Sequence, residues 1–96
     1  MSASPSLIAD IGATNARFAL CGDDGIYAEK NLLCEDYPTL VDAVKAYLED
    51  LGGLQPRRAA FAIAGPVNGD YFKMMNHSWE FSIEQTRQTL GFEYFT

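Results

Sequence analysis

One short stretch near the amino terminus, Asp-Ile-Gly-Ala-Thr-Asn-Ala-Arg, holds the residue types best suited to chemistry. Gly12 lacks a Cβ, so a ligand can approach the backbone closely there. Thr14 and Asn15 offer hydrogen-bond donors, and Asp10 is an anion that could hold Mg²⁺ through its water shell. Arg17 adds a positive charge at neutral pH. Together these residue types indicate a site for a polyphosphate.

The elements that would position this stretch are two apolar runs, residues 7–9 and 18–20, which predict two strands joined by a tight polar turn. The alternative is an ordinary β-hairpin with a polar turn, because Gly, Asn and Thr are common turn residues. Both interpretations stay open on these residues alone, since short motifs often match by chance.

Length and composition predict one small globular domain, because the 96 residues are 48% hydrophobic and 21% charged. Seven basic against thirteen acidic residues give a net charge of −6. Such a chain repels nucleic acid and anionic membranes, so we expect neither as a partner. The adjacent pair Arg57 and Arg58 is interpreted as a solvated entry to a strand.

Two cysteines, Cys21 and Cys34, belong to no Cys-x-x-Cys or Cys/His pattern and are interpreted as reduced thiols. The only histidine, His77, cannot form a histidine metal site by itself and is assigned a structural hydrogen-bonding role. No signal peptide or transmembrane helix fits the amino terminus, because it lacks Lys and Arg and Asp10 interrupts its apolar run. We therefore expect a cytoplasmic protein.

Further along, the chain alternates between strand and helix patterns. A turn at residues 23–25 and an edge strand at 26–34 would complete an antiparallel start of three strands. Residues 39–51 have helical periodicity, with a capping box at the start and a glycine pair after the end. The face expected to be buried carries Leu40, Val44, Tyr47, Leu48 and Leu51.

Residues 59–64 are an uninterrupted apolar run, which predicts a parallel strand buried on both faces and a β-α-β crossover back to the first sheet. A hairpin is expected at 67–75, and Trp79 is interpreted as a packing residue. A second helix is expected from Ser82, as N-cap, to Gly91. The last six residues resemble the beginning of another strand.

Four segments in a fixed order, residues 7–18, 36–40, 62–70 and 76–83, resemble the N-terminal part of the bacterial glucokinase family. That family lies within the superfamily of sugar kinases, actin and heat-shock ATPases. The resemblance implies an α/β fold, a ribonuclease H-like (actin-like ATPase) half-domain with a mixed sheet. Residues 1–96 would be the small N-terminal domain of a two-domain sugar kinase, incomplete at its C-terminal end and truncated before the last strand is complete.

The same resemblance implies ATP-dependent phosphorylation of glucose to glucose 6-phosphate, the entry to glycolysis, with ATP and Mg²⁺ as cofactors. Asp10 would hold Mg²⁺ through water, and the turn amides would face the phosphates. The family's catalytic aspartate lies beyond Thr96, so the chain alone is expected to be inactive. Asp70 and Glu80 are not expected to replace it, because a general base must reach its proton. The implied ATP site comprises Ala9, Asp10, Ile11, Gly12, Ala13 and Thr14.

One departure from the family pattern concerns the loop, where a usual glycine pair appears as Gly12 and Ala13. If the second position needs a positive φ, alanine would be strained by about 1 kcal/mol, and otherwise it would fit. Residues 65–67 and 76–79 are each either part of the sugar pocket or a structural turn.

Three alternatives to a glucose kinase remain on the sequence. One is a nucleotide-binding module without chemistry, and another is a kinase for a different hexose. The third is an inert fragment that associates through its unfinished sheet edge, because strand edges invite pairing. A homodimer is expected in either the kinase or the fragment interpretation.

Overall fold

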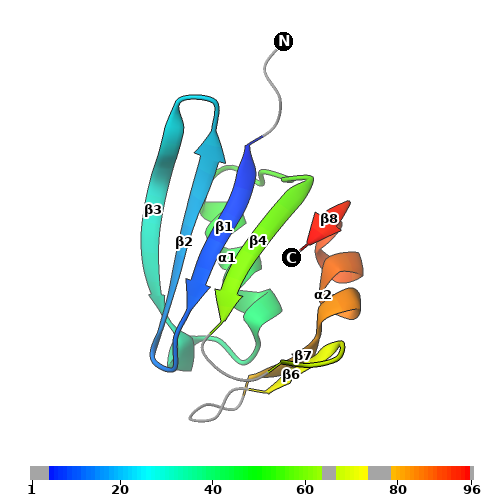
Figure 1. The fold of residues 1–96 in the computed structure, drawn as a ribbon. Coiled ribbons are helices and arrows are strands. Elements are labelled where there is room, and N and C mark those ends of the chain that lie inside the picture. Colours follow the sequence, from blue (N-terminus) through cyan, green and yellow to red (C-terminus); the bar gives the residue numbers. More distant parts are fainter. Residues whose placement is uncertain (1–4, 64–66, 74–78, 96) are drawn as a thin grey trace.

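The computed structural model describes residues 5–63, 67–73 and 79–95 as two sheets with two α-helices. A larger sheet has the strand order β3-β2-β1-β4-β8, and a smaller sheet has the order β5-β6-β7 (Figure 1). The larger sheet comprises β1 (Ser6–Ile11), β2 (Asn15–Gly22), β3 (Gly25–Leu33), β4 (Arg58–Ile63) and β8 (Tyr94–Phe95). The remaining elements are η1 (Cys34–Asp36), α1 (Leu40–Asp50), β5 (Val67–Asn68), β6 (Tyr71–Lys73), β7 (Glu80–Ser82) and α2 (Ile83–Leu90).

The three-strand antiparallel start is confirmed. β1 pairs with β2 in register from Ser6↔Cys21 to Ile11↔Ala16, and β2 pairs antiparallel with β3 at the sheet edge. The β2–β3 connection needs a glycine, because Gly25 has a φ of 117°. Because side chains alternate along a strand, successive residues of β1 and β2 face either α1 or the opposite side of the sheet.

Helix α1 forms where its periodicity predicted it. The Thr39 side chain accepts a hydrogen bond from the Asp42 amide at 3.2 Å, which caps the first turn. Gly52 and Gly53 then take φ values of 85° and 81° and end the helix. The prediction that Leu51 is buried was wrong: it is the C-cap, it is 36% exposed, and the chain has already left the helical face there.

The predicted β-α-β crossover is confirmed, because β4 follows α1 and pairs parallel with β1, and β8 pairs parallel with β4. The prediction that β4 is buried on both faces was wrong for this chain. Ala59 is buried toward α1, whereas Ala60 and Ala62 are exposed on the opposite face. Figure 1 shows α1 behind the sheet and no described helix in front of it. We call this uncovered side the open face.

The second half of the chain begins with the β5–β6 hairpin, which was predicted, and continues with β7, which was not. Helix α2 is capped at its start by Ser82, whose side chain accepts from the Gln85 amide at 3.1 Å, and at its end by Gly91, which has a φ of 74°. Asp70 adds a second cap, because its carboxylate accepts from the Glu84 amide at 2.8 Å. This carboxylate therefore has a structural role.

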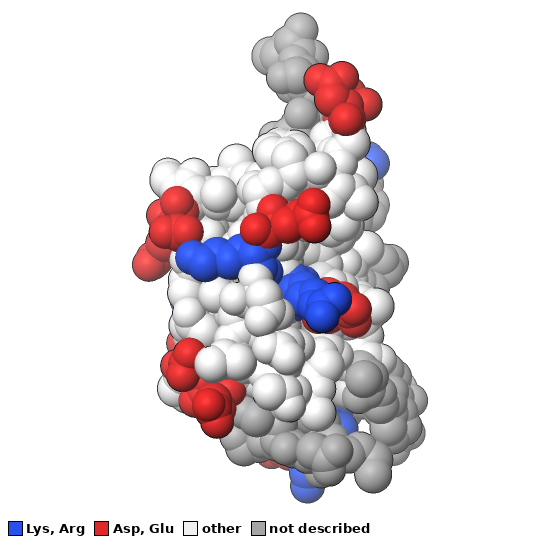
Figure 2. Space-filling model, turned by 90° about the vertical axis from the view of Figure 1, so that its left-hand side faces the viewer, with Lys and Arg blue, Asp and Glu red and all other residues white. Residues whose placement is uncertain are grey.

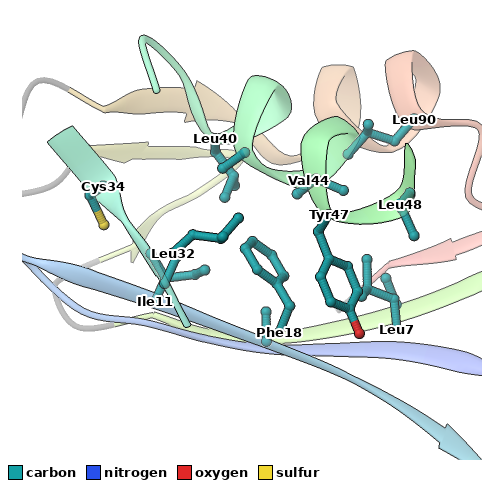
Figure 3. Close-up of a cluster of buried hydrophobic side chains, with 14 of the residues drawn as sticks. Leu7, Ile11, Phe18, Leu32, Cys34, Leu40, Val44, Tyr47, Leu48 and Leu90 are labelled. Carbon is teal, nitrogen blue, oxygen red and sulfur yellow. The ribbon is translucent and has the colours of Figure 1, made fainter. Parts of the chain in front are cut away.

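The core lies between the larger sheet and α1, as Figure 3 shows. The rings of Phe18 and Tyr47 stack there with centroids 5.2 Å apart. The Tyr47 hydroxyl donates a 2.7 Å hydrogen bond to the Ala28 carbonyl, at an irregularity in β3 where Ala28 has a φ of 56°. Trp79 is also buried, and its indole nitrogen donates to the Tyr37 carbonyl at 2.9 Å, which confirms its packing role. Neither described helix has the length and apolar character needed to cross a bilayer.

Candidate phosphate-binding site

The stretch singled out in the sequence forms the turn between β1 and β2, at the carboxyl end of β1. Figure 1 shows this turn at the lower end of the sheet, where β4 also ends. In open α/β sheets, ligands usually bind at the carboxyl ends of the parallel strands. The parallel pair β1 and β4 therefore places the turn at the expected end of the sheet.

The turn exposes backbone donors. The Gly12 amide donates to the Asn15 carbonyl at 2.8 Å, which closes the turn. The amides of Ala13 and Thr14 donate to no residue that the structure describes, and both residues are exposed. Adjacent unpaired amides in an exposed turn form a ready anion-binding surface.

The alanine in place of a second loop glycine is not strained. Among the described residues, Ala28 alone of the non-glycine residues has a positive φ, so Ala13 does not adopt the conformation that would strain an alanine. Gly12 also lacks a positive φ, and a Cβ built on it would meet only the Asn15 carbonyl oxygen, at 3.4 Å. The strain considered for Ala13 is therefore absent, and at Gly12 the missing Cβ leaves the backbone accessible.

Asp10 is exposed on the open face, one residue before the end of β1. Strand pairing puts Arg17 of β2 beside it on one side and Ala62 of β4 on the other. No ion pair among the described residues engages Asp10 or Arg17, so both charges are available to a ligand. Both line a hollow of about 520 Å³ that also reaches Asn31 of β3.

The carboxylate of Asp10 fits a Mg²⁺ ion that takes most of its ligands from elsewhere. No group of three or more potential ligands occurs among His, Cys, Asp and Glu in the described parts of the chain. Mg²⁺ commonly keeps several waters and is held by one or two carboxylates together with substrate phosphates. A single exposed carboxylate meets the protein's share of that pattern.

The six sequence-predicted ATP-site residues do not all present side chains to the loop surface. Asp10, Ala13 and Thr14 are exposed, whereas Ala9 and Ile11 are buried against the core at 8% and 0% exposure. Ala9 and Ile11 can therefore contribute only backbone and spacing.

Sequence reasoning missed two residues that contact the turn from β3 and η1. The Cys34 amide donates to the Thr14 carbonyl at 2.9 Å, and its thiol donates to the Gly12 carbonyl at 3.5 Å. The Asn31 side chain donates to the Asn15 side chain at 2.9 Å. These contacts join positions 16 to 22 residues apart, and no local pattern in the sequence indicates them. Burial raises the pKa of the Cys34 thiol, so it is no candidate nucleophile.

Several sequence predictions concern residues that the structure does not describe. These include Gly65 and Pro66, in the loop expected to be either part of the sugar pocket or a structural turn, and residues 76–78, which contain His77. Figure 2 shows the β3 side of the molecule, where basic and acidic side chains are interspersed. Lys30 illustrates this mixing, because its ammonium group lies 2.9 Å from the Asp50 carboxylate.

The mixed sheet, its crossover and a polar turn after the first strand define a ribonuclease H-like half-domain of the actin-like ATPase class. A crystal structure of glucokinase from an Antarctic psychrotroph superposes with a TM-score of 0.89 and 32% identity, covering 97% of this chain and 31% of that one. The sequence model of the glucokinase family matches residues 7–96. The chain belongs to the glucokinase family.

Individual relatives agree with this assignment. A glucokinase from Neisseria meningitidis serogroup C is 54% identical over 90 residues, which are 93% of this chain and 27% of that protein. A glucokinase from Campylobacter jejuni subsp. doylei is 53% identical over the same shares. A protein named "Bifunctional protein glk" from Burkholderia lata is 51% identical, with 93% of this chain matching 14% of it. The chain thus spans about a quarter of the length of the glucokinases it matches.

Proposed function

We propose that this chain supplies the phosphate-binding turn of a longer protein that transfers the γ-phosphoryl group of ATP to the 6-hydroxyl of glucose. The observation that carries the proposal is the pair of exposed, unpaired amides of Ala13 and Thr14 in the turn that follows the exposed Asp10 at the end of β1. Membership of the glucokinase family supports the choice of sugar and reaction.

In this proposal the turn binds and orients the polyphosphate. The Ala13 and Thr14 amides donate to phosphate oxygens, and Gly12 keeps the backbone accessible. Such donors stabilise charge on the transferring group, where most of phosphoryl-transfer catalysis lies. Mg²⁺, held by Asp10 through water, would neutralise phosphate charge when bound. Ala9 and Ile11 fix the end of β1 from the core side.

The remaining groups needed for turnover would come from the rest of the parent protein. Transfer forms a phosphorus–oxygen bond to the sugar, releases ADP and leaves one proton for a base. Asp70 caps α2 and is engaged there, so it is not proposed as that base. Residues 1–96 would form the small domain of a cytoplasmic, homodimeric enzyme, with the catalytic aspartate beyond Thr96.

The direct test is hexose-dependent ADP formation with Mg-ATP, comparing the complete parent protein with the 96-residue chain. We expect the parent to turn over glucose and the short chain to be inactive. An Asp10→Asn parent variant should lose most of the activity, whereas Asp23→Asn, at an exposed turn between β2 and β3, should retain it. A parent that is inactive with glucose but active with another hexose would reject the sugar assignment, and an active short chain would reject the location of the base.

A further inference from the structure

The turn at residues 12–15 has few hydrogen bonds of its own. Its closing contact is the 2.8 Å bond from the Gly12 amide to the Asn15 carbonyl. An exposed turn held by one bond can rotate its peptide planes, and a rotated plane would present a carbonyl oxygen to a phosphate. Something else must therefore keep the donors turned outward.

Cys34 donates hydrogen bonds to two carbonyls of this turn from the buried side. It follows β3 as the first residue of η1 and is 0% exposed, at the edge of the buried cluster in Figure 3. Its thiol donates to the Gly12 carbonyl at 3.5 Å and its amide donates to the Thr14 carbonyl at 2.9 Å. Cys34 therefore contacts the turn at alternate peptide groups.

The contact between the Cys34 thiol and the Gly12 carbonyl also determines where the Ala13 N–H points. The Gly12 carbonyl and the Ala13 amide belong to one peptide group, and no described peptide bond is cis. In a trans peptide the C=O and N–H bonds point to opposite sides of the chain. When the thiol holds the Gly12 carbonyl inward, the Ala13 N–H must point away from the core, toward the solvent-exposed side.

Asn31 secures the far end of the turn. Its side-chain amide donates to the Asn15 side-chain oxygen at 2.9 Å, from the neighbouring strand β3. Asn15 in turn provides the carbonyl that closes the turn onto Gly12. The segment from Asn31 to Cys34 thus contacts the turn at both of its ends.

We propose that Cys34 is a positioning residue for phosphate binding: its thiol fixes the Gly12–Ala13 peptide so that the Ala13 amide faces the phosphates, and Asn31 assists it. The inference rests on the proposed function and deepens it. It predicts that loss of the thiol weakens ATP binding selectively. A purely structural role would instead lower the amount of folded enzyme and leave the KM for ATP unchanged.

The test compares Cys34→Ala, Cys34→Ser and Cys21→Ala in the complete parent protein. Cys34→Ala should raise the KM for ATP about fivefold, as loss of one modest hydrogen bond would, with the KM for glucose unchanged. Cys34→Ser keeps a donor and should restore most of the affinity. Cys21 is an exposed cysteine of β2, at the opposite end of that strand from the turn, so its variant should match the wild type.

A second readout needs no turnover. In the 96-residue chain, hydrogen exchange of the Gly12 amide should be faster in Cys34→Ala than in the wild type and slow again in Cys34→Ser. A folded Cys34→Ala protein with wild-type exchange and wild-type KM for ATP would overturn the inference, as would failure of serine to restore either.

If Cys34→Ala does not fold, the Asn31→Ala variant tests the inference instead. Asn31 is exposed, so removing its side chain leaves the core intact. This variant must raise the KM for ATP without changing that for glucose, and an unchanged value overturns the inference. A wild-type parent that uses no ATP would contradict the proposed function separately, and the Gly12 exchange rates would still decide whether Cys34 orients the turn.

Discussion

At the scale of single residues, folding and ligand binding place different requirements on the turn after β1. Gly12 has no positive φ, and a Cβ added to it would have no neighbour closer than 3.4 Å, so folding does not require glycine there. A bound phosphate would require it, because a Cβ keeps a ligand away from the backbone. Stability and binding should therefore respond differently to the same substitution.

Gly12→Ala tests this separation. We expect the free energy of unfolding to change by less than about 1 kcal/mol, since alanine fits the observed backbone. We expect Mg-ATP affinity to fall by at least about tenfold, which corresponds to about 1.4 kcal/mol. Denaturant unfolding and calorimetric titration measure the two quantities.

Gly25→Ala is the matched control, because Gly25 has a φ of 117° and lies between β2 and β3, away from the turn. It should destabilise the fold by about 1 kcal/mol or more and leave Mg-ATP affinity unchanged. The reverse pattern in the two variants would show that Gly12 serves the fold.

The residues of the site differed in how far the sequence could predict them. Asp10, Gly12 and Thr14 stand close together in the chain, so their residue types and spacing were enough to predict a phosphate-binding turn. Cys34 contacts the same turn from 22 positions away, through a thiol and a backbone amide. Such contacts depend on the register of β3 against β2, which the sequence pattern does not specify at single-residue precision.

At the scale of elements, a partly buried hydrogen bond joins α1 to the edge strand β3, in addition to the exposed Lys30–Asp50 ion pair. Ala28 is held at a φ of 56°, and its carbonyl accepts from the Tyr47 hydroxyl at 2.7 Å. Non-glycine residues avoid this region unless the surroundings hold them there. The bond therefore satisfies the polar end of a buried tyrosine and fixes the irregular part of β3.

Tyr47→Phe should lower the free energy of unfolding by about 1 kcal/mol at neutral pH, because the Ala28 carbonyl loses its donor. It should also change how the free energy of unfolding depends on pH in the alkaline range. Burial, followed by the nearby Tyr27, raises the pKa of Tyr47 above its ordinary value. The contribution of the neutral hydroxyl is therefore complete below that ordinary pKa and is lost as the pH rises through the raised one.

Denaturant unfolding from neutral to alkaline pH measures both effects, with Tyr94→Phe as the control, because Tyr94 is 59% exposed. The Tyr94 variant should behave as the wild type. Equal stability of the Tyr47→Phe and wild-type proteins at neutral pH would contradict the role given to this bond.

Elements with a strong local pattern were predictable. Both helices, their caps and the first three strands followed from periodicity and turn residues, because these depend on neighbours in the chain. Strand β7 was missed, since it is three residues long and merges with the N-cap of α2. The irregularity at Ala28 was also missed, because the residue types around it do not require a positive φ.

At the scale of the whole molecule, the larger sheet is covered by α1 on one side and has an open face on the other. The apolar run of β4 predicted burial on both faces, yet Ala60 and Ala62 are exposed. The hydrophobic pattern of a strand predicts that its faces are buried, but it does not indicate which parts of the protein cover them. The strand itself and its parallel pairing were predicted, and its surroundings were not.

The most direct test of the account is an amide NMR titration of the 96-residue chain with Mg-ATP, with adenosine and Mg²⁺ as the control ligand. We expect the amide resonances of Ala13 and Thr14 to shift with Mg-ATP but not with adenosine, because the phosphates are the proposed partners of these donors. Resonances of the β5–β6 hairpin should stay in place. Unchanged Ala13 and Thr14 resonances at saturating Mg-ATP would contradict the assignment of this turn as the phosphate-binding site.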